Sequence, residues 1–225
     1  MSKIFHCLFE QSGTFKNEFK KMGYQAYDYD ILNDFNETDF IIDIFQEINN
    51  AYDNKPSIFD KISETDQIIA FFPCVRFEAQ IILSFKGNNQ GFKNWTTEQK
   101  LEYDIKLHDG LHELYGLISK FVIVCLRKKI PLIIENPYST QHYLHRYWAL
   151  EPTLVDMNRR DTGDYYEKPT QYWFINCEPK HNFIFESVDI KTKKRVSNSG
   201  TVERSMISKD YANRFIREYI LEKKE

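Results

Sequence analysis

The chain has 225 residues, of which 42% are hydrophobic and 16% aromatic, and its formal net charge at pH 7 is −3. This length suits one substantial core, and the hydrophobic content predicts a folded protein rather than a disordered one. The slightly negative charge argues against a protein that coats nucleic acid through charge alone, but it does not exclude a local basic groove. We therefore expect a single domain over residues 1–225.

The first half of the chain alternates strand and helix patterns. Strands are predicted at residues 3–9, 25–29, 40–42, 67–72 and 131–134, and helices at 15–22, 44–51 and 97–128. Strands that alternate with helices indicate an α/β fold with a doubly wound, mostly parallel sheet and right-handed crossovers. The Gly- and Asn-rich stretch 86–95 is predicted to be a loop.

The last third of the chain has a less regular pattern. Residues 172–175 are predicted to form a strand, and residues 209–223 a helix with Ser208 as its N-cap. The four cysteines show neither the spacing of a metal site nor that of a disulfide framework, so we expect no metal and a reducing compartment. Neither a signal peptide nor an apolar run long enough to cross a membrane is predicted.

Residues 8–15 lie at the junction between the first predicted strand and the first predicted helix. This junction is the usual place for a nucleotide cofactor in a doubly wound sheet, and Gly13 allows a ligand to approach the backbone closely. Asp28 or Asp30, at the end of the next strand, is placed to bind the two hydroxyls of a ribose. Asp43 follows the third strand and could accept a hydrogen bond from an adenine amino group. Taken alone, each aspartate is also explained by a helix cap or a surface charge.

Two short strings carry the candidate chemistry, Phe72-Pro73-Cys74 and Glu135-Asn136-Pro137. Each follows a run that is predicted to be a buried strand, and ligands and catalytic groups collect at such strand ends. The first string presents a thiol beside a rigid proline, and the second presents a carboxylic acid beside an amide. A thiol nucleophile with a carboxylic acid is the chemistry needed to attack an electron-poor pyrimidine ring. A lone cysteine is more often a small buried hydrophobic residue, but Cys74 is predicted to leave its strand.

These motifs, in this order, resemble those of the DNA cytosine-5 methyltransferases, especially the short phage-type members, over about residues 5–220. The resemblance implies a sheet of the S-adenosylmethionine-dependent methyltransferase type. It also implies a role for each matching residue: the cofactor loop (Phe9, Gln11, Gly13, Phe15), the ribose-binding acid (Asp30, or Asp28), the adenine-binding acid (Asp43), the nucleophile motif (Pro73, Cys74), the ring-activating motif (Glu135, Asn136) and the arginine that contacts the target nucleotide (Arg159 or Arg160). Pro73 would also contact the cofactor.

The resemblance further implies a reaction and a setting. The Cys74 thiolate would attack C6 of cytosine, Glu135 would stabilise the adduct through N3, and C5 would take the methyl group of S-adenosyl-L-methionine before a base removes its proton. In duplex DNA the target base must first leave the stack. The partner would be DNA, duplex or single-stranded, in the cytoplasm of a bacterial or phage-infected cell.

Three features depart from the family pattern. Gln11 stands where the cofactor loop usually has a second glycine, and Val75-Arg76-Phe77-Glu78 replaces the common Gln-x-Phe-Ser after the nucleophile. Too few residues separate Arg159 from the C-terminal segment to form a separate target-recognition domain. Two alternatives therefore stay open: methylation of a free cytosine nucleotide, and a non-catalytic protein of the same fold that binds the cofactor or nucleic acid.

Overall fold

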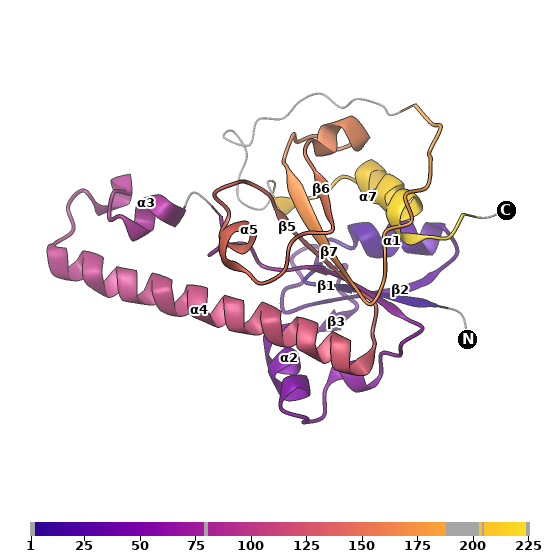
Figure 1. The fold of residues 1–225 in the computed structure, drawn as a ribbon, viewed down its shortest axis with the longest axis horizontal. Coiled ribbons are helices and arrows are strands. Elements are labelled where there is room, and N and C mark those ends of the chain that lie inside the picture. The colour runs from indigo at the N-terminus through magenta and orange to yellow at the C-terminus, as the bar shows by residue number, and fades with distance from the viewer. Residues whose placement is uncertain (1–2, 79–80, 188–202, 204, 224–225) are drawn as a thin grey trace.

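A seven-stranded sheet lies at the centre of the protein, with helices on both of its faces (Figure 1). The computed structural model describes residues 3–78, 81–187, 203 and 205–223. The strands are β1 (Ile4–Leu8), β2 (Gln25–Asp30), β3 (Phe40–Ile41), β4 (Gln67–Phe71), β5 (Leu132–Pro137), β6 (Leu154–Asp156) and β7 (Thr170–Ile175). Their order is β3-β2-β1-β4-β5-β7-β6. Neighbours among β1 to β5 are parallel, and β7 is antiparallel to both β5 and β6. The predicted α/β fold with a mostly parallel sheet is confirmed.

The helices form one layer on each face of the sheet. In the described residues they are α1 (Thr14–Lys21), α2 (Ile44–Tyr52), α3 (Ile82–Phe85), α4 (Thr97–Lys128), α5 (Tyr143–Tyr147) and α7 (Lys209–Phe215), with 3₁₀ turns η1 (Ile58–Asp60), η3 (Gln90–Phe92) and η4 (Arg159–Thr162) and a π-helix, η6 (Ile216–Ile220). Helices α2 and α4 pack against one face, and α1 and α7 against the other. None of the helices in the described part of the chain has the length and apolar character needed to cross a membrane.

Residues of the central strands alternate between two hydrophobic cores. In β4, Ile68 and Ala70 belong to the core under α2 and α4, whereas Ile69 belongs to the core under α1 and α7. Leu132 and Ile133 of β5 divide between the cores in the same way. This alternation follows from the two-residue period of a strand, and covered faces on both sides are typical of parallel sheets.

Helix α4 has the bounds that the sequence predicts, because its ends are specified locally. Thr96 and Gln99 form a reciprocal capping box at its start, and Lys129 ends it in a left-handed conformation with φ of 55°. The first part of α4 projects away from the sheet together with α3 (Figure 1). The prediction of a loop at 86–95 is wrong in part, since the stretch contains η3 and a buried Phe92 whose ring stacks on Trp95 at 4.3 Å.

The antiparallel edge of the sheet departs most from the prediction. Strand β5 continues through Pro137, so Glu135 and Asn136 lie within a strand rather than after it. The cause is β7, which pairs with β5 as far as Thr170 opposite Pro137. The predictions had no counterpart of α5 or β6. The C-terminal helix, predicted to reach residue 223, is α7 followed by a π-helix that ends at Ile220.

Candidate active site

A cavity of about 210 Å³ lies at the carboxyl ends of β1, β4 and β5. Strands β2 and β3 extend the sheet on one side of β1, and β4 and β5 extend it on the other. The topological switch point is therefore between β1 and β4, which is where open α/β sheets bind ligands. Six residues with predicted roles line this one cavity: Phe9, Gln11, Asp30, Pro73, Cys74 and Glu135.

The loop after β1 is shaped by its own contacts. Phe9 adopts φ of 60°, and its backbone N–H donates to the Tyr29 carbonyl at 2.9 Å. The Glu10 carboxylate accepts from the backbone N–H groups of Phe15 (2.7 Å) and Lys16 (3.2 Å), so it caps α1. Burial raises the pKa of Glu10 to about 7. Glu10 lines the cavity, although the sequence gave no reason to assign it a role.

Gly13 and Phe15, predicted to bind the cofactor, do not line the cavity. Gly13 has φ of 64°, and a Cβ atom there would lie 3.0 Å from both Asn17 Nδ2 and Glu37 Oε2, so the turn itself requires glycine. The ring of Phe15 is buried in the core, 4.8 Å from that of Phe71. Gln11 does line the cavity, and its side-chain oxygen accepts from the backbone N–H of Asp34 at 3.1 Å.

The structure separates the three candidate cofactor aspartates. Asp30 is half-buried and lines the cavity. Asp28 is fully buried and forms an ion pair with Lys16 at 2.9 Å. Asp43 is exposed and caps α2 by accepting from the Gln46 N–H at 3.1 Å. Only Asp30 is thus placed to contact a ligand in the cavity, and the assignments of Asp28 and Asp43 are not supported by this geometry.

Cys74 is half-buried at the start of a tight turn that follows β4. Its carbonyl accepts from the Phe77 N–H at 2.8 Å, and this turn brings Glu78 back over the thiol. The Cys74 Sγ donates to Glu78 Oε1 at 3.1 Å. Burial and the adjacent Glu78 carboxylate raise the pKa of Cys74 to about 12. In this conformation the group is a thiol, not the thiolate that nucleophilic attack requires.

Glu135 and Asn136 tie β5 to the end of β4. Asn136 is fully buried, and its Nδ2 donates to the Phe72 carbonyl at 2.6 Å, directly beside the Pro73-Cys74 pair. Glu135 is also buried, and burial raises its pKa above the usual 4.5. A carboxyl that holds its proton more tightly is suited to donate a hydrogen bond to a ring nitrogen.

The two candidate arginines have different surroundings. Arg159 is fully buried and pairs with the buried Asp164, and its Nη1 lies 3.9 Å from Glu135 Oε1. Its guanidinium also lies 5.3 Å from the centre of the Tyr211 ring. Arg160 instead pairs with Glu167 at 3.5 Å and does not line the cavity. Arg159 is therefore the candidate arginine that lies next to Glu135, whereas the pair of Arg160 with Glu167 lies outside the lining of the cavity.

Besides Glu10, Lys168 and Glu78 lie near the chemistry without a role assigned from the sequence. Lys168 lines the cavity with Cys74 and Glu135, and its ammonium forms no hydrogen bond or ion pair with any described residue. The positive charge of Lys168 favours the ionised forms of Cys74 and Glu135, so it opposes part of the increase in pKa that burial causes in each group. Glu78 could have been found from the sequence, because it follows Cys74 by four residues, a spacing that brings two side chains together in a helical turn.

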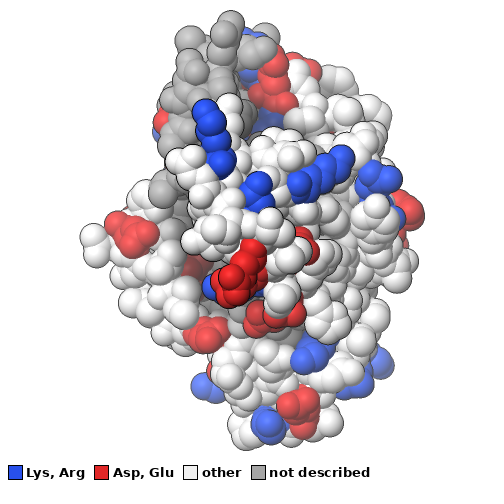
Figure 2. Space-filling model, turned by 90° about the vertical axis from the view of Figure 1, so that its left-hand side faces the viewer, with Lys and Arg blue, Asp and Glu red and all other residues white. Residues whose placement is uncertain are grey.

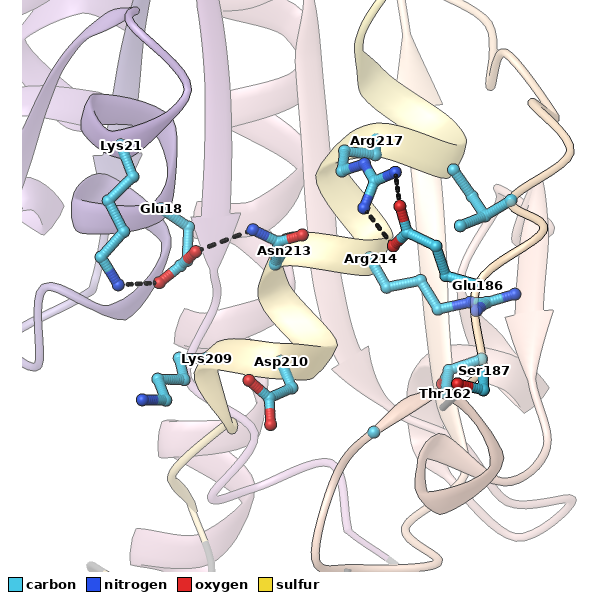
Figure 3. A pocket seen from close by; sticks show the side chains of 12 residues that line it. Glu18, Lys21, Thr162, Glu186, Ser187, Lys209, Asp210, Asn213, Arg214 and Arg217 are labelled. Carbon is cyan, nitrogen blue, oxygen red and sulfur yellow. Dashed lines mark hydrogen bonds and ion pairs between the residues drawn. The ribbon is translucent and has the colours of Figure 1, made fainter. Parts of the chain in front are cut away.

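A larger cavity, of about 470 Å³, lies between α1 and α7 (Figure 3). Several of its charged side chains are paired. Glu18 contacts both Lys21 and Asn213, and Arg217 pairs with both oxygens of Glu186 at 2.6 and 2.7 Å. None of the described residues that line this cavity is a cysteine, so it lacks the thiol that the cavity at the switch point presents.

No model of a known protein family matches this chain, and no curated protein matches it. Within the residues that the structure describes, no group of three or more His, Cys, Asp or Glu side chains is placed to hold a metal ion. The function is therefore inferred from the geometry of the cavity.

Proposed function

We propose that this protein transfers a methyl group from S-adenosylmethionine to C5 of cytosine in DNA, with Cys74 as nucleophile and Glu135 as acid. The observation that carries the proposal is the single cavity at the switch point, which Cys74 and Glu135 line from neighbouring strand ends. The order of the first five strands, with ligand-facing groups at their carboxyl ends, is compatible with a sheet of the S-adenosylmethionine-dependent methyltransferase type.

The residues on the β1 and β2 side of the cavity fit the proposed cofactor. Asp30 supplies carboxylate oxygens that suit ribose hydroxyls, Ser12 supplies a hydroxyl, and Phe9 and Phe35 supply apolar walls for a base. The volume of about 210 Å³ is below the roughly 300–1,000 Å³ of common ligand sites. We therefore expect the cavity to widen when a cofactor and a nucleotide bind together.

The protein's own residues would act as follows. Cys74 loses its proton, for which the Glu78 carboxylate is the nearest acceptor, and the sulfur then bonds to C6 of the cytosine ring. Attack at C6 shifts an electron pair of the ring toward C5. Glu135 donates a proton or hydrogen bond to N3 and so stabilises the charge that develops. When bound, S-adenosylmethionine supplies the activated methyl group for C5. A base would then remove the C5 proton, and the electron pair of that bond would expel the Cys74 sulfur from C6 and restore the ring.

The neighbours of Glu135 would hold it in place for this step. Asn136 ties β5 to the Phe72 carbonyl, and Arg159 Nη1 lies 3.9 Å from the Glu135 carboxyl. In duplex DNA, the target cytosine must leave the stack to reach a cavity at a strand end.

Incubation with tritiated S-adenosylmethionine and either duplex DNA or dCTP tests the proposal. We expect label in DNA, recovered as 5-methylcytosine after digestion. Label in dCTP alone would show that the substrate is a free nucleotide. Cofactor binding without label in either substrate would show a non-catalytic binding protein.

The aspartates provide a matched test of the cofactor position. Asp30→Ala should weaken S-adenosylmethionine binding by about 0.5–3 kcal/mol, because hydrogen bonds to a charged group are lost. Asp43→Ala should leave the affinity unchanged and lower the free energy of unfolding by about 1 kcal/mol, because a helix cap is lost. Calorimetry and urea denaturation of both variants measure these effects. Equal affinities in Asp30→Ala and the wild type would remove Asp30 from the cofactor site.

A further inference from the structure

Residues 82–112 form an arm that projects from the body of the protein (Figure 1). The arm consists of α3, η3 and the first half of α4. Its base adjoins the candidate nucleophile, since α3 begins at Ile82, soon after the turn that starts at Cys74. Two contacts join that turn to α4. A Cβ atom on Gly110 would lie 3.1 Å from Arg76 Nε, and the ring of Phe77 lies 5.0 Å from that of Tyr115.

The stretch of the arm before α4 carries lysines and no acidic residue, whereas the start of α4 carries acids of its own, with Glu98 and Glu102 on either side of Lys100. The sequence contains no Asp or Glu between Glu78 and Glu98, but it places Lys86 and Lys93 in this stretch and Lys100 just after it. None of the three ammonium groups forms an ion pair with a described residue. In Figure 2, which faces the side toward which the arm projects, several Lys and Arg side chains form a row above a group of Asp and Glu side chains.

The same region presents amide groups that have no partner within the described protein. Asn88, Gln90 and Asn94 are exposed, and their side chains form no hydrogen bond with described residues. Together with Lys93 and Lys100, Asn88 and Gln90 line an open cavity of about 560 Å³. We call Lys86, Lys93, Lys100, Asn88, Gln90 and Asn94 the η3 face.

The η3 face is built on a packed base rather than on a free loop. Phe92 is 7% exposed and its ring lies 5.1 Å from that of Tyr103 on α4. Trp95 stacks on Phe92 and remains 36% exposed, which leaves an aromatic edge next to the lysines. An unpaired cation, a free amide and an aromatic surface are the groups that contact phosphates, base edges and bases, respectively.

We infer that the η3 face binds duplex DNA next to the target cytosine and takes the part that a separate recognition domain would otherwise play. This inference rests on the proposed function and names DNA, rather than a free nucleotide, as its substrate. The lysines would contact phosphates and set the register, and the amides would face base edges. The arm is joined to the turn that holds Cys74 through α4, so DNA bound at the η3 face would be held on the element that contacts this turn.

The charge of the η3 face favours DNA over a second copy of the chain as its occupant. A symmetric contact between two such faces would bring like charges together, and three unpaired ammonium groups on each side would oppose it. The phosphates of DNA would instead neutralise these groups and release counterions.

Fluorescence anisotropy with labelled duplex DNA, measured over a series of NaCl concentrations, tests the inference. The first variant of the full-length protein carries Lys86→Gln, Lys93→Gln and Lys100→Gln. The control carries Lys55→Gln, Lys61→Gln and Lys129→Gln, which remove the same charge from exposed lysines near α2 and the other end of α4.

We expect the arm variant to bind DNA at least ~10-fold more weakly at low salt, with a salt slope reduced by about 2–3, because each phosphate contact contributes about 0.9. The control variant should keep the wild-type affinity for DNA and the wild-type salt slope. Equal binding by the two variants overturns the inference, and so does a wild-type protein that does not bind duplex DNA. A change in mass by light scattering with unchanged DNA binding would also overturn it, in favour of a second copy.

These outcomes are independent of the methylation assay. If DNA binding depends on the η3 face but no label reaches DNA, the inference stands and the proposed catalysis fails. If dCTP is methylated and duplex DNA is not bound, the inference fails and methyl transfer stands.

Discussion

The ends of β4 and β5 lie side by side in the sheet, but their functional groups are held in different ways. Glu135 on β5 is fixed by distant parts of the chain: it pairs with Tyr172 of β7 and lies next to Arg159. Cys74 after β4 is positioned by its own turn, and Glu78 of that turn is the hydrogen-bond partner of its thiol. The acid is thus preorganised by the fold, whereas the reactivity of the thiol depends on a single neighbour.

This difference has consequences for catalysis and for stability. A group held by many tertiary contacts keeps its geometry when one loop moves, and this is the condition for stabilising a developing charge. A group held by one local contact is released when its turn rearranges. We therefore expect substitutions around Glu135 to affect folding, and substitutions around Cys74 to affect reactivity.

The largest effect should come from Cys74→Ser. An alcohol is a far weaker nucleophile than a thiolate at neutral pH, so methyl transfer should fall below detection while the free energy of unfolding stays within about 0.5 kcal/mol. Cys177→Ser is the matched control, because Cys177 is also half-buried but lies at the opposite end of the sheet, after β7. Near-wild-type turnover in Cys74→Ser would refute the cytosine-5 mechanism.

Arg159→Leu should be the most damaging change for stability. It leaves Asp164 buried without its partner, and removal of one member of a buried ion pair costs about 3–5 kcal/mol. The neighbouring Arg160→Leu removes a partly exposed pair with Glu167 and should change stability by at most about 1 kcal/mol. Urea denaturation measures both variants. An equal loss of unfolding free energy in the two variants would contradict the structure, in which only Arg159 is fully buried.

Glu135→Gln should lower turnover by about 10²-fold or more with little change in cofactor affinity, because Gln can donate a hydrogen bond but cannot deliver a proton. Turnover per folded molecule and calorimetry measure these two quantities. Intact turnover with a lower melting temperature would assign Glu135 a structural role only.

The same variant tests the raised pKa of Glu135. A carboxyl whose pKa is higher in the folded state contributes stability that is complete below pH 4.5 and is lost as the pH rises through the raised value. Glutamine cannot ionise, so the stability of Glu135→Gln should fall less than that of the wild type over this range. If the free energies of unfolding of the variant and the wild type change with pH in parallel, the pKa of Glu135 is not raised.

The features that the sequence predicted well are those that neighbouring residues specify. Helix α4 has its predicted bounds because its capping residues and hydrophobic period are local. The positions of Cys74 and Glu135 on neighbouring strands, near the same edge of the sheet, followed from the α/β pattern. The role of each residue at those ends remains a prediction.

Features that depend on distant contacts were not predicted. Strand β5 extends past Glu135 because β7 pairs with it from 35 residues or so further along the chain. Asp28 and Asp30 lie on the same face of β2, but Lys16 pairs with Asp28 whereas Asp30 lines the cavity. Similarly, adjacent Arg159 and Arg160 differ only in which one the fold buries against Asp164.

The smallest effect, and the sharpest test of local control at β4, is expected for Glu78→Gln. The Glu78 carboxylate contributes to the pKa of about 12 for Cys74, so its neutralisation should lower that pKa by about one unit or more. Because the thiolate is the reactive form, alkylation of Cys74 by iodoacetamide should then become about 10-fold faster near neutral pH. Peptide mass spectrometry separates Cys74 from the other three cysteines.

Turnover should distinguish the two roles of the Glu78 carboxylate. If it takes the proton of the thiol during attack, Glu78→Gln should react faster with iodoacetamide and yet methylate cytosine no faster than the wild type. Glu113→Gln, which neutralises an exposed carboxylate on α4, should change neither rate. An alkylation profile of Glu78→Gln that superimposes on the wild-type profile would show that Cys74, like Glu135, is controlled by the fold rather than by its own turn.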